Sequence, residues 1–499
     1  MTDPYDTVPY PSAPFTQTHP DRLATLAILL GMTPAPVERC RVLELGCGDG
    51  SNLIPMAFSL PESEFFGLDR AEGAIRQGRA RAEALGLTNI TLRALDLLEF
   101  PAELGPFDYL ITHGLYAWVP AAVQEKILAI SQAHLAAQGV AYVSYNALPG
   151  AHLRLMLREM MLYHTREAEG PAQQIAQAQA LLRWLAAAQR ESDPYGALLK
   201  VEAERALERR GQFLYHDELA EVYAPVYFQE FLERAGRHGL QYLAEANLTE
   251  LAPREFPEEV RAKLEELSAE PLLREQYLDF LRCRKFRQTL LCHQEVVLDR
   301  ASQPERVTRL YAASAAEAVK ATGEAEEFRG PQGAAMSTAH PMARAAIRSL
   351  AEAWPEALGF EELLVAVRER AGLAKRPEDA AALGEILYWT CAAGLVELHA
   401  WRPPCAARAG ERPVASRLVR LQLREGAEVT TLRHRTVTVE GALERQLLLL
   451  LDGTRDRPAL VKELREFAVG QAGACPTAID AGALEGALGK LARLGLLAG

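Results

Sequence analysis

Apolar runs and helical patterns alternate along the first 150 residues. The apolar runs cover Arg41 to Leu45, Glu64 to Leu68, Ile90 to Leu92, Phe107 to Thr112 and Val140 to Tyr145. Strands that alternate with helices form parallel sheets whose crossover connections are helical. The sequence therefore predicts five strands of an open α/β sheet over residues 35–150.

The pattern becomes helical after Pro149-Gly150. Residues 151 to about 210 are rich in Ala, Leu and Arg, and the strand pattern returns only at Leu240 to Glu245 and at Arg287 to Val296. We therefore expect a helical insertion at 151–225, followed by two more strands at 226–300 with a smaller helical insert at 248–286. The result is a seven-stranded sheet with helical insertions.

Gly- and Ala-rich text around residues 320–340 predicts a linker over 301–340. Two similar units follow, at 341–410 and 411–499, and each has the order helix, helix, Gly-Leu, strand. This order is typical of winged-helix modules, although generic helical packing gives the same pattern. Winged helices bind DNA or protein.

The net charge and the cysteine content limit the kinds of partner that the protein can bind and the cellular compartment in which we expect it. The chain has 499 residues and a formal net charge of −12, which argues against broad binding to nucleic acid or to anionic membrane. Its seven cysteines include no C-x-x-C pair, and no apolar run approaches the ~20 residues of a membrane span. We expect a cytoplasmic protein that binds a protein partner.

The first strand ends in three alternate glycines, Gly46, Gly48 and Gly50, and then a helical pattern begins. Glycine permits φ > 0 and close approach of a ligand, and the helix start offers free N–H groups. The third glycine does not fit the dinucleotide spacing G-x-G-x-x-G, and the acidic Glu44 lies two residues before Gly46. This turn resembles the first motif of class I S-adenosylmethionine-dependent methyltransferases.

That resemblance implies S-adenosylmethionine as the cofactor and a set of residues around it. Asp69 ends the second strand, where an acidic side chain takes both hydroxyls of a ribose, although it also fits a helix N-cap. Asp96 matches the family's partner of the adenine amino group, although solvation alone also explains it. The residues assigned to cofactor binding are Glu44, Gly46, Cys47, Gly48, Asp69, Arg70, Asp96, Leu97 and His113.

An aromatic loop follows the fourth strand, and ligands of open α/β sheets bind beyond the carboxyl ends of strands. Tyr116, Trp118 and Tyr145 are candidates for an aromatic channel that guides a cationic side chain, and core aromatics would give the same pattern. Asn146 ends the fifth strand and completes the candidate catalytic set. His113 fits a base or, more simply, a packing role. No metal site is expected.

Further motifs resemble one family of bacterial protein-lysine methyltransferases, those that act on rickettsial outer membrane protein B. They are Tyr5-Asp6, Pro9 to Ser12, Pro14-Phe15, Thr18 to Leu23, Trp118 to Pro120 and Tyr142 to Asn146. His216 to Leu219, Pro225 to Phe228 and Leu290 to His293 resemble the segment known as the methyltransferase regulatory domain. The resemblance implies methylation of lysine on a surface or secreted protein before export. Residues 1–34, with their prolines and aromatic side chains, are expected to lie over the cofactor site, although a plain packing arm with aromatic anchors fits the same residues.

Two other functions remain open at this point. One is methylation of a small molecule or modified peptide in a biosynthetic pathway, and the other is a non-catalytic binding protein that responds to S-adenosylmethionine. The Asn/Asp-Pro-Pro-aromatic run of adenine and glutamine methyltransferases is absent after the fourth strand, where this chain has Ile111 to Gly114. We also expect the insertion at 151–225 to form a substrate cap or a homodimer contact.

Overall fold

The computed structural model describes residues 7–8, 10–190, 193–251, 256–267, 270–301, 303–323, 325–469 and 479–498. Tyr5, Asp6 and Pro9 of the N-terminal motif lie outside the described residues, as does Cys475. The other six cysteines are free thiols.

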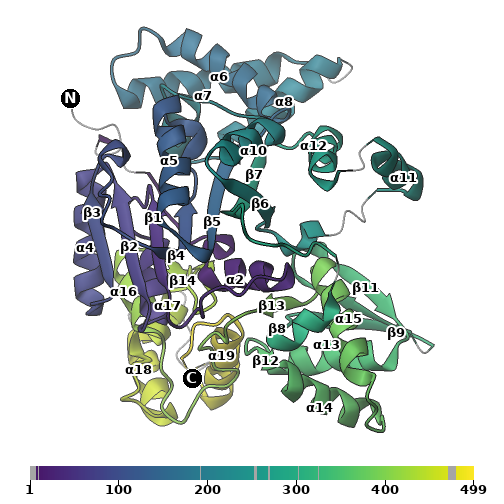
Figure 1. Ribbon diagram of the computed structural model, residues 1–499. Helices are drawn as coiled ribbons and strands as arrows, with labels where there is room; N and C mark the ends of the chain where they lie inside the picture. Colours follow the sequence, from purple (N-terminus) through teal and green to yellow (C-terminus); the bar gives the residue numbers. More distant parts are fainter. Residues whose placement is uncertain are drawn as a thin grey trace.

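A mixed sheet of seven strands, in the order β3-β2-β1-β4-β5-β7-β6, forms the centre of the molecule (Figure 1). Strands β1 to β5 pair in parallel, and β7 is antiparallel to both β5 and β6. This confirms the predicted Rossmann-like methyltransferase fold. The strands are β1 (Arg41–Leu45), β2 (Glu64–Asp69), β3 (Ile90–Ala94), β4 (Phe107–Thr112), β5 (Leu135–Asn146), β6 (Leu240–Glu245) and β7 (Phe286–His293).

Three strands differ in length from the prediction. β5 begins at Leu135 instead of Val140, because Leu135 pairs with Phe107 of β4 across an irregular stretch that has no strand pattern. β7 ends at His293 instead of Val296, because His293 pairs with Leu240, the first residue of β6, and the ladder stops there. β3 runs two residues beyond Leu92.

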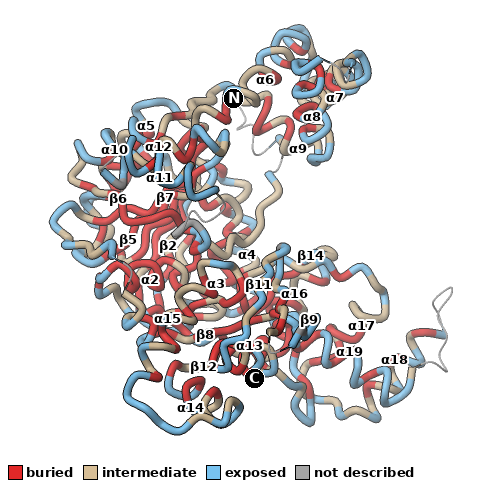
Figure 2. Tube along the Cα trace, turned by 90° about the vertical axis from the view of Figure 1, so that its right-hand side faces the viewer, coloured by how far each residue is buried: buried red, intermediate tan, exposed pale blue. Residues whose placement is uncertain are grey.

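Helices cover both faces of the sheet, as the alternation of side chains along its strands requires. Val42, Tyr109 and Tyr142 belong to the core on the α2 side, and Leu43, Leu110 and Val143 to the core on the other side. Figure 2 shows this buried interior in red. The covering helices are α2 (Pro20–Leu29), α3 (Leu53–Ser59), α4 (Glu72–Leu85), α5 (Ala121–His134) and α10 (Phe228–Arg237).

The insertion after β5 is helical, as predicted, and rises above the sheet (Figure 1). Its own core includes Leu157, Met161 and Leu182. Among the described residues, no helix has both the length and the apolar character of a membrane span. The insertion after β5 contains α6 (Ala151–Thr165), α7 (Pro171–Ala188), α8 (Pro194–Leu207), α9 (Gly211–Phe213) and the π-helix η4 (Leu214–Glu218). The smaller insert, between β6 and β7, contains η5 (Leu248–Leu251), α11 (Glu258–Leu267) and α12 (Pro271–Arg282).

The prediction of a linker at 301–340 is wrong. Gly323, at φ +61°, lies at the turn of a β-hairpin, and Val307, Leu310 and Phe328 are buried. The Gly- and Ala-rich composition concealed short strands, because small side chains give a weak alternation signal. The elements are η6 (Pro304–Arg309), β8 (Tyr311–Ala313) and the antiparallel sheet of β9 (Glu317–Thr322), β10 (Ala325–Arg329) and β11 (Ala335–Thr338).

Two further units complete the chain in the order that the sequence predicts. The first shares one continuous core with α2, and its small sheet recruits β8 from before residue 341. In the second, the predicted strand at 494–497 is reduced to isolated bridges at Leu497 and Ala498. The elements are α13 (Pro341–Ala353), β12 (Leu358–Gly359), α14 (Phe360–Ala371), α15 (Asp379–Ala392) and β13 (Glu397–His399), then α16 (Arg417–Glu425), β14 (Glu428–Thr430), β15 (Thr436–Thr438), α17 (Ala442–Leu450), α18 (Arg457–Val469) and α19 (Ala481–Arg493).

A buried ion cluster holds the antiparallel end of the sheet. Arg287 of β7 has a fully buried side chain, which pairs with Glu245 of β6 at 2.7 Å and with Asp279 of α12 at 2.8 Å. Its guanidinium also lies over the ring of Phe228 in α10, 3.8 Å from the centroid. Removing one member of such a cluster leaves buried charges uncompensated.

We expect Arg287→Ala to lower the free energy of unfolding by about 3–5 kcal/mol, because the buried Glu245 loses its arginine partner and the buried Asp279 keeps only its pair with Arg284. Urea denaturation followed by fluorescence measures the change. The matched control is Arg39→Ala, whose side chain is 80% exposed and whose partner Glu62 is 66% exposed, and it should cost less than about 1 kcal/mol. Equal effects of the two variants would contradict a structural role for the cluster.

Candidate functional site

The glycine turn after β1 takes the backbone conformation that its sequence requires. Gly46, Gly48 and Gly50 all have positive φ, between 55° and 76°. The backbone N–H groups of Gly46 and Cys47 donate to the carbonyl of Leu68, at 2.8 and 3.1 Å. The turn is therefore fixed to the end of β2.

Asp69 at the end of β2 joins this turn directly. Its Oδ2 accepts the Gly48 N–H at 2.8 Å, and its Oδ1 accepts the Ala71 N–H at 2.8 Å. The side chain is partly exposed, so each oxygen keeps acceptor capacity toward a ligand. The following residue, Arg70, is exposed.

Glu44 is a buried carboxyl beneath the same turn. Its Oε1 accepts a hydrogen bond from Asn52 Nδ2 at 2.8 Å, whereas its Oε2 is buried and has no hydrogen-bond partner in the described part of the chain. Burial, aided by the charges of Asp69 and Asp49 and opposed by the Asn52 hydrogen bond, raises the pKa of Glu44 to about 8. A buried acceptor without a partner is the feature that a cationic ligand group would satisfy.

Cys47 contributes its backbone to the turn and its side chain to the core. The thiol is 5% exposed, and burial raises its pKa well above the usual value. Its Sγ would lie 2.8 Å from a Cβ on Gly67, so β2 needs glycine there. Any contact of Cys47 with a ligand therefore comes from its backbone.

Asp96 and Leu97 follow β3 at the same edge of the sheet. Asp96 is exposed and caps the short helix η2 (Leu97–Glu99), its Oδ1 accepting the Leu98 N–H at 2.9 Å. Leu97 is buried in the core on the α5 side. Asp96 thus has the solvated position that the sequence allowed, and the structure adds a helix cap and a place beside the strand ends.

His113, directly after β4, lies under the N-terminal arm. Its ring stacks on Phe15 at a centroid distance of 3.8 Å, and its Nδ1 lies 2.9 Å from the Tyr142 hydroxyl. Burial lowers the pKa of His113 to about 4, so the ring is neutral. It is a packing and hydrogen-bonding residue at the strand end.

Tyr116 and Tyr145 do not line the predicted aromatic channel. Both are buried and pack against Phe231 of α10, at centroid distances of 5.3 and 4.3 Å. The Tyr145 hydroxyl lies 3.2 Å from Thr289 Oγ1 and points toward the Arg287 cluster. The channel prediction is corrected here, because Tyr145 points to the α5 and α10 face while its neighbours in β5 alternate away from it.

Trp118 and Asn146 have different surroundings. Trp118, in η3 (Tyr116–Trp118), is partly exposed, and its ring lies 4.8 Å from that of Tyr223. Asn146 is 6% exposed and shares the face of β5 that carries Tyr142 and Ser144, the two side chains that meet His113. Of the candidate catalytic residues in β5, Asn146 therefore lies on the face that meets His113, and Tyr145 lies on the opposite face.

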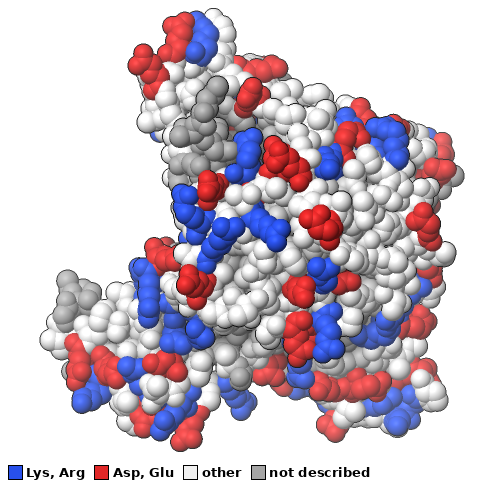
Figure 3. Space-filling view, turned by 60° about the vertical axis from the view of Figure 1, so that its left-hand side comes forward, with Lys and Arg blue, Asp and Glu red and all other residues white. Residues whose placement is uncertain are grey.

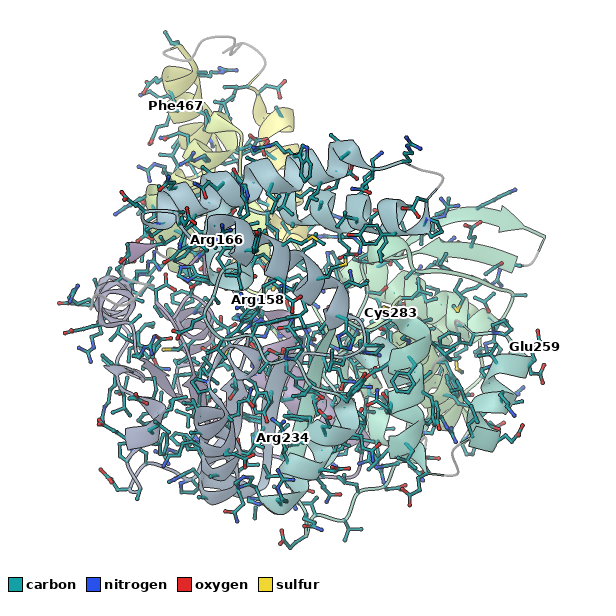
Figure 4. The ribbon with its side chains drawn as sticks, turned by 90° about the horizontal axis from the view of Figure 1, so that it is seen from above. Arg158, Arg166, Arg234, Glu259, Cys283 and Phe467 are labelled. Atoms are coloured by element: carbon teal, nitrogen blue, oxygen red, sulfur yellow. The ribbon has the colours of Figure 1, made fainter. Side chains whose placement is uncertain are left out.

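Arg154 of α6 already occupies the cation position at Trp118. Its guanidinium lies 5.0 Å from the Trp118 ring centroid and pairs with Glu218 at 2.8 Å and with Asp217 at 3.3 Å. Arg158, labelled in Figure 4, extends the same contact from α6 and donates to the Glu218 carbonyl at 2.8 Å. Within the insertion, α6 is thereby fixed to the segment 214–221.

The sequence did not identify several residues that build the site. A Cβ on Gly78 of α4 would lie 2.5 Å from the Asp49 carbonyl oxygen, so only a glycine at this position lets α4 pack this closely against the glycine turn. A Cβ on Gly48 would lie 3.3 Å from the hydroxyl oxygen of Ser12, so the N-terminal arm covers the glycine turn at this point. Asn52 lies just before α3, and a polar residue at a helix start could have been noticed in the sequence. Its hydrogen-bond partner His434 lies far along the chain, and no local pattern indicates that contact.

Carboxylates dominate the edge of the sheet at β1, β2 and β3. Glu44, Asp69 and Asp96 lie at or just after the three strand ends, and Asp49 in the turn is paired with Arg81. Elsewhere, acidic and basic side chains are interspersed over the face shown in Figure 3. Since the pKa of Glu44 is raised to about 8 and Asp49 is paired, the carboxylates of Asp69 and Asp96 give this edge its local negative potential, which suits a positively charged ligand.

Three family models match the chain. The model described as a methyltransferase domain matches residues 36–219, the predicted methyltransferase regulatory domain matches 210–293, and the PKMT C-terminal winged helix domain matches 411–478. Together they cover most of the sheet, the insertion and the second C-terminal unit.

Two uncharacterized proteins of Rickettsia prowazekii (strain Madrid E) are among the curated relatives. One is 38% identical over 299 residues, a match that takes in 60% of this chain and 54% of the relative. The other is 33% identical over 240 residues, 48% of this chain and 96% of the relative. The chain thus spans about half the length of the first and nearly all of the second.

The solved structure of PKMT2 from Rickettsia typhi in complex with AdoHcy is similar along the whole chain. It has a TM-score of 0.88 and 26% sequence identity, and the match covers 98% of this chain and 100% of that chain. A second structure of the same protein gives the same values. On this agreement of sequence motifs, family models and fold, the chain belongs to the class I S-adenosylmethionine-dependent methyltransferases that carry a methyltransferase regulatory domain and a PKMT winged helix domain.

Proposed function

We propose that this methyltransferase acts on lysine side chains of a bacterial surface or secreted protein before export. The observation that carries the proposal is the similarity to PKMT2, which includes the C-terminal units as well as the sheet. The arm, the insertion and the two C-terminal units also surround the sheet with more surface than a small acceptor needs. A macromolecular substrate accounts for that surface better.

The residues at the strand ends fit S-adenosylmethionine. Asp69 would take the ribose hydroxyls, Asp96 the adenine amino group, and the buried Glu44 Oε2 a cationic group. The backbone of Gly46, Cys47 and Gly48 would border the cofactor, with Arg70, Leu97 and His113 as further proposed neighbours. The bound cofactor would supply a methyl group on a sulfonium: a nucleophilic nitrogen bonds to the methyl carbon in line as the carbon–sulfur bond breaks, and the sulfur leaves as the neutral thioether.

The lysine must reach this site as a neutral amine. Its ordinary pKa of about 10.4 falls when the ammonium is desolvated beside a positive charge. His113, with a pKa of about 4, is too weak a base to remove that proton. In this proposal the proton leaves to solvent before the amine enters the site. The chain then excludes water and aligns the nitrogen, with Asn146 and Trp118 as the proposed positioning groups.

The insertion presents exposed aromatic side chains that suit a protein contact. Tyr163 of α6, Trp184 of α7 and Tyr195 of α8 are 72%, 65% and 48% exposed. Aromatic residues are enriched in protein interfaces. The homodimer through this insertion stays a prediction, with substrate capping as its alternative.

Asp69→Ala should weaken AdoHcy binding by about 2 kcal/mol, roughly thirtyfold, because charge-assisted hydrogen bonds to the ribose are lost. Titration calorimetry measures the affinity. Glu64→Ala, which removes an exposed carboxylate from the opposite end of β2, is the matched control and should bind normally. An unchanged affinity for Asp69→Ala would remove this residue from the site.

Glu44→Gln should stabilise the free protein increasingly as the pH rises. The folded-state pKa of about 8 lies above the ordinary Glu value, so the protonated carboxyl supports folding at low pH and that support is lost as the pH rises toward 8. We expect the difference in unfolding free energy from the unmodified chain to grow by a few kcal/mol between pH 5 and about 9.

Urea denaturation at several pH values measures this difference. Glu62→Gln is the control, because Glu62 is 66% exposed and paired only at the surface with Arg39. A pH-independent difference for Glu44→Gln would show that the carboxyl is ionised throughout.

Incubation with methyl-labelled cofactor and extract of the source cells should label a protein. Mass spectrometry should place added units of about 14 Da on lysine. The rate should rise from about pH 7 to 9, because the neutral amine becomes more abundant. The Asp69→Ala protein serves as the negative control. Label confined to small molecules at every pH would assign the enzyme to a biosynthetic pathway instead.

A further inference from the structure

A loop of the second C-terminal unit, Thr431 to Arg435, reaches the strand ends of the methyltransferase domain. His434 in this loop is 5% exposed and has a φ of +55°, which is uncommon for a residue with a side chain. Its carbonyl accepts a hydrogen bond from Thr16 Oγ1 of the arm at 2.8 Å, and its Nε2 lies 3.0 Å from Asn52 Oδ1. A distant part of the chain thus touches a residue that contacts Glu44.

The hydrogen bonds of Asn52 fix the direction of this contact. The Phe15 backbone N–H can only donate, and it points at Asn52 Oδ1 from 2.9 Å, so that atom is the amide oxygen. The NH₂ group must then donate to Glu44 Oε1 and to Thr18 Oγ1, at 2.8 and 3.0 Å. His434 must therefore donate from Nε2–H.

The protonation state of His434 agrees with that role. Burial, with a further contribution from His19, lowers the pKa of His434 well below its usual value, so the ring is neutral and carries one proton. With this proton on Nε2, both donors and both acceptor positions of the Asn52 amide are used. Rotating the amide by 180° would place its NH₂ against two donors, so the donor toward Glu44 is held in place.

The loop itself is held by the first C-terminal unit. Arg433 donates to the Pro355 carbonyl at 2.7 Å and pairs with Glu397 of β13, and Arg435 pairs with the same carboxylate at 2.5 Å. At the far side of the unit, Arg81 of α4 pairs with Glu425 of α16 at 3.0 Å. Figure 1 shows the unit, in yellow, against the lower part of the sheet. The position of His434 therefore depends on how the second C-terminal unit packs against the rest of the protein.

We propose that His434 is a positioning residue of the cofactor site, which acts through Asn52 on Glu44 and couples cofactor affinity to docking of the C-terminal unit. This inference rests on the proposed role of Glu44 in binding the cofactor. Coupling of this kind is reciprocal, so cofactor binding also strengthens the docking of the loop 431–435. The C-terminal unit thereby gains a regulatory role in addition to any contact with substrate.

Calorimetry with AdoHcy on full-length variants tests the proposal. His434→Phe keeps an aromatic ring but removes the donor, and it should weaken binding by about tenfold, the effect of one lost hydrogen bond. His434→Gln restores an N–H donor and should recover affinity to within about threefold of the unmodified chain. Arg455→Ala, whose ion pairs are with Asp452 and Glu463 of the same unit, should bind normally.

The outcomes separate this inference from the proposed function. Weak binding by Glu44→Gln together with normal binding by His434→Phe would overturn the inference and leave the cofactor site intact. Normal binding by Glu44→Gln would instead remove the proposed role of Glu44, and the inference with it. Equal losses in His434→Phe, His434→Gln and Arg455→Ala would mean that the unit acts by general stability alone, which also overturns the inference.

Hydrogen exchange on the unmodified chain gives a second test that needs no variant. Saturation with AdoHcy should slow exchange of the backbone amides of residues 431–435, because ligand binding and loop docking are linked. The amides of α18, in the same unit, serve as the internal control. Exchange that is unchanged in the loop, or slowed equally in α18, would overturn the coupling.

Discussion

The side-chain amide of Asn52 is the constraint on which the assembled site depends. It joins β1 through Glu44, the N-terminal arm through Phe15 and Thr18, and the last unit of the chain through His434. A buried amide is costly unless all its hydrogen-bonding positions are used, and here that requires three distant segments to be in place together. The free energy of this amide therefore favours the complete assembly over any part of it.

A continuous core reinforces the same assembly. The helix α2, which follows the arm, packs with the sheet on one side and with the first C-terminal unit on the other. A polar contact accompanies it, since Asp21 accepts the Trp401 N–H at 2.9 Å and lies 2.6 Å from His399 Nδ1. The boundaries drawn from composition separate units that share one interior, so the arm acts as a structural link as well as a cover for the site.

The sequence predicted the parts of the fold that depend on local patterns. The seven strands and the glycine turn at Gly46 and Gly48 follow from short-range periodicity and from backbone needs, and the structure confirms both. The strands at 301–340 were missed because their small side chains carry little alternation. The direction of Tyr145 depends on which helices cover each face, and the contact of His434 with Asn52 spans 382 positions, so neither has a local signal.

The aromatic pair at Trp118 bears on how an acceptor reaches the methyl group. Arg154 lies over both Trp118 and Tyr223 and is paired with two carboxylates, one of which also accepts a hydrogen bond from Tyr10 of the arm. A lysine ammonium would have to displace this arginine to use the same rings, whereas a neutral amine needs no cation site. For the lysine acceptor proposed above, the arrangement therefore favours delivery as an already deprotonated amine. Selection of the acceptor then depends on desolvation along the route and on the surfaces that hold the substrate, and not on recognition of a cation at Trp118.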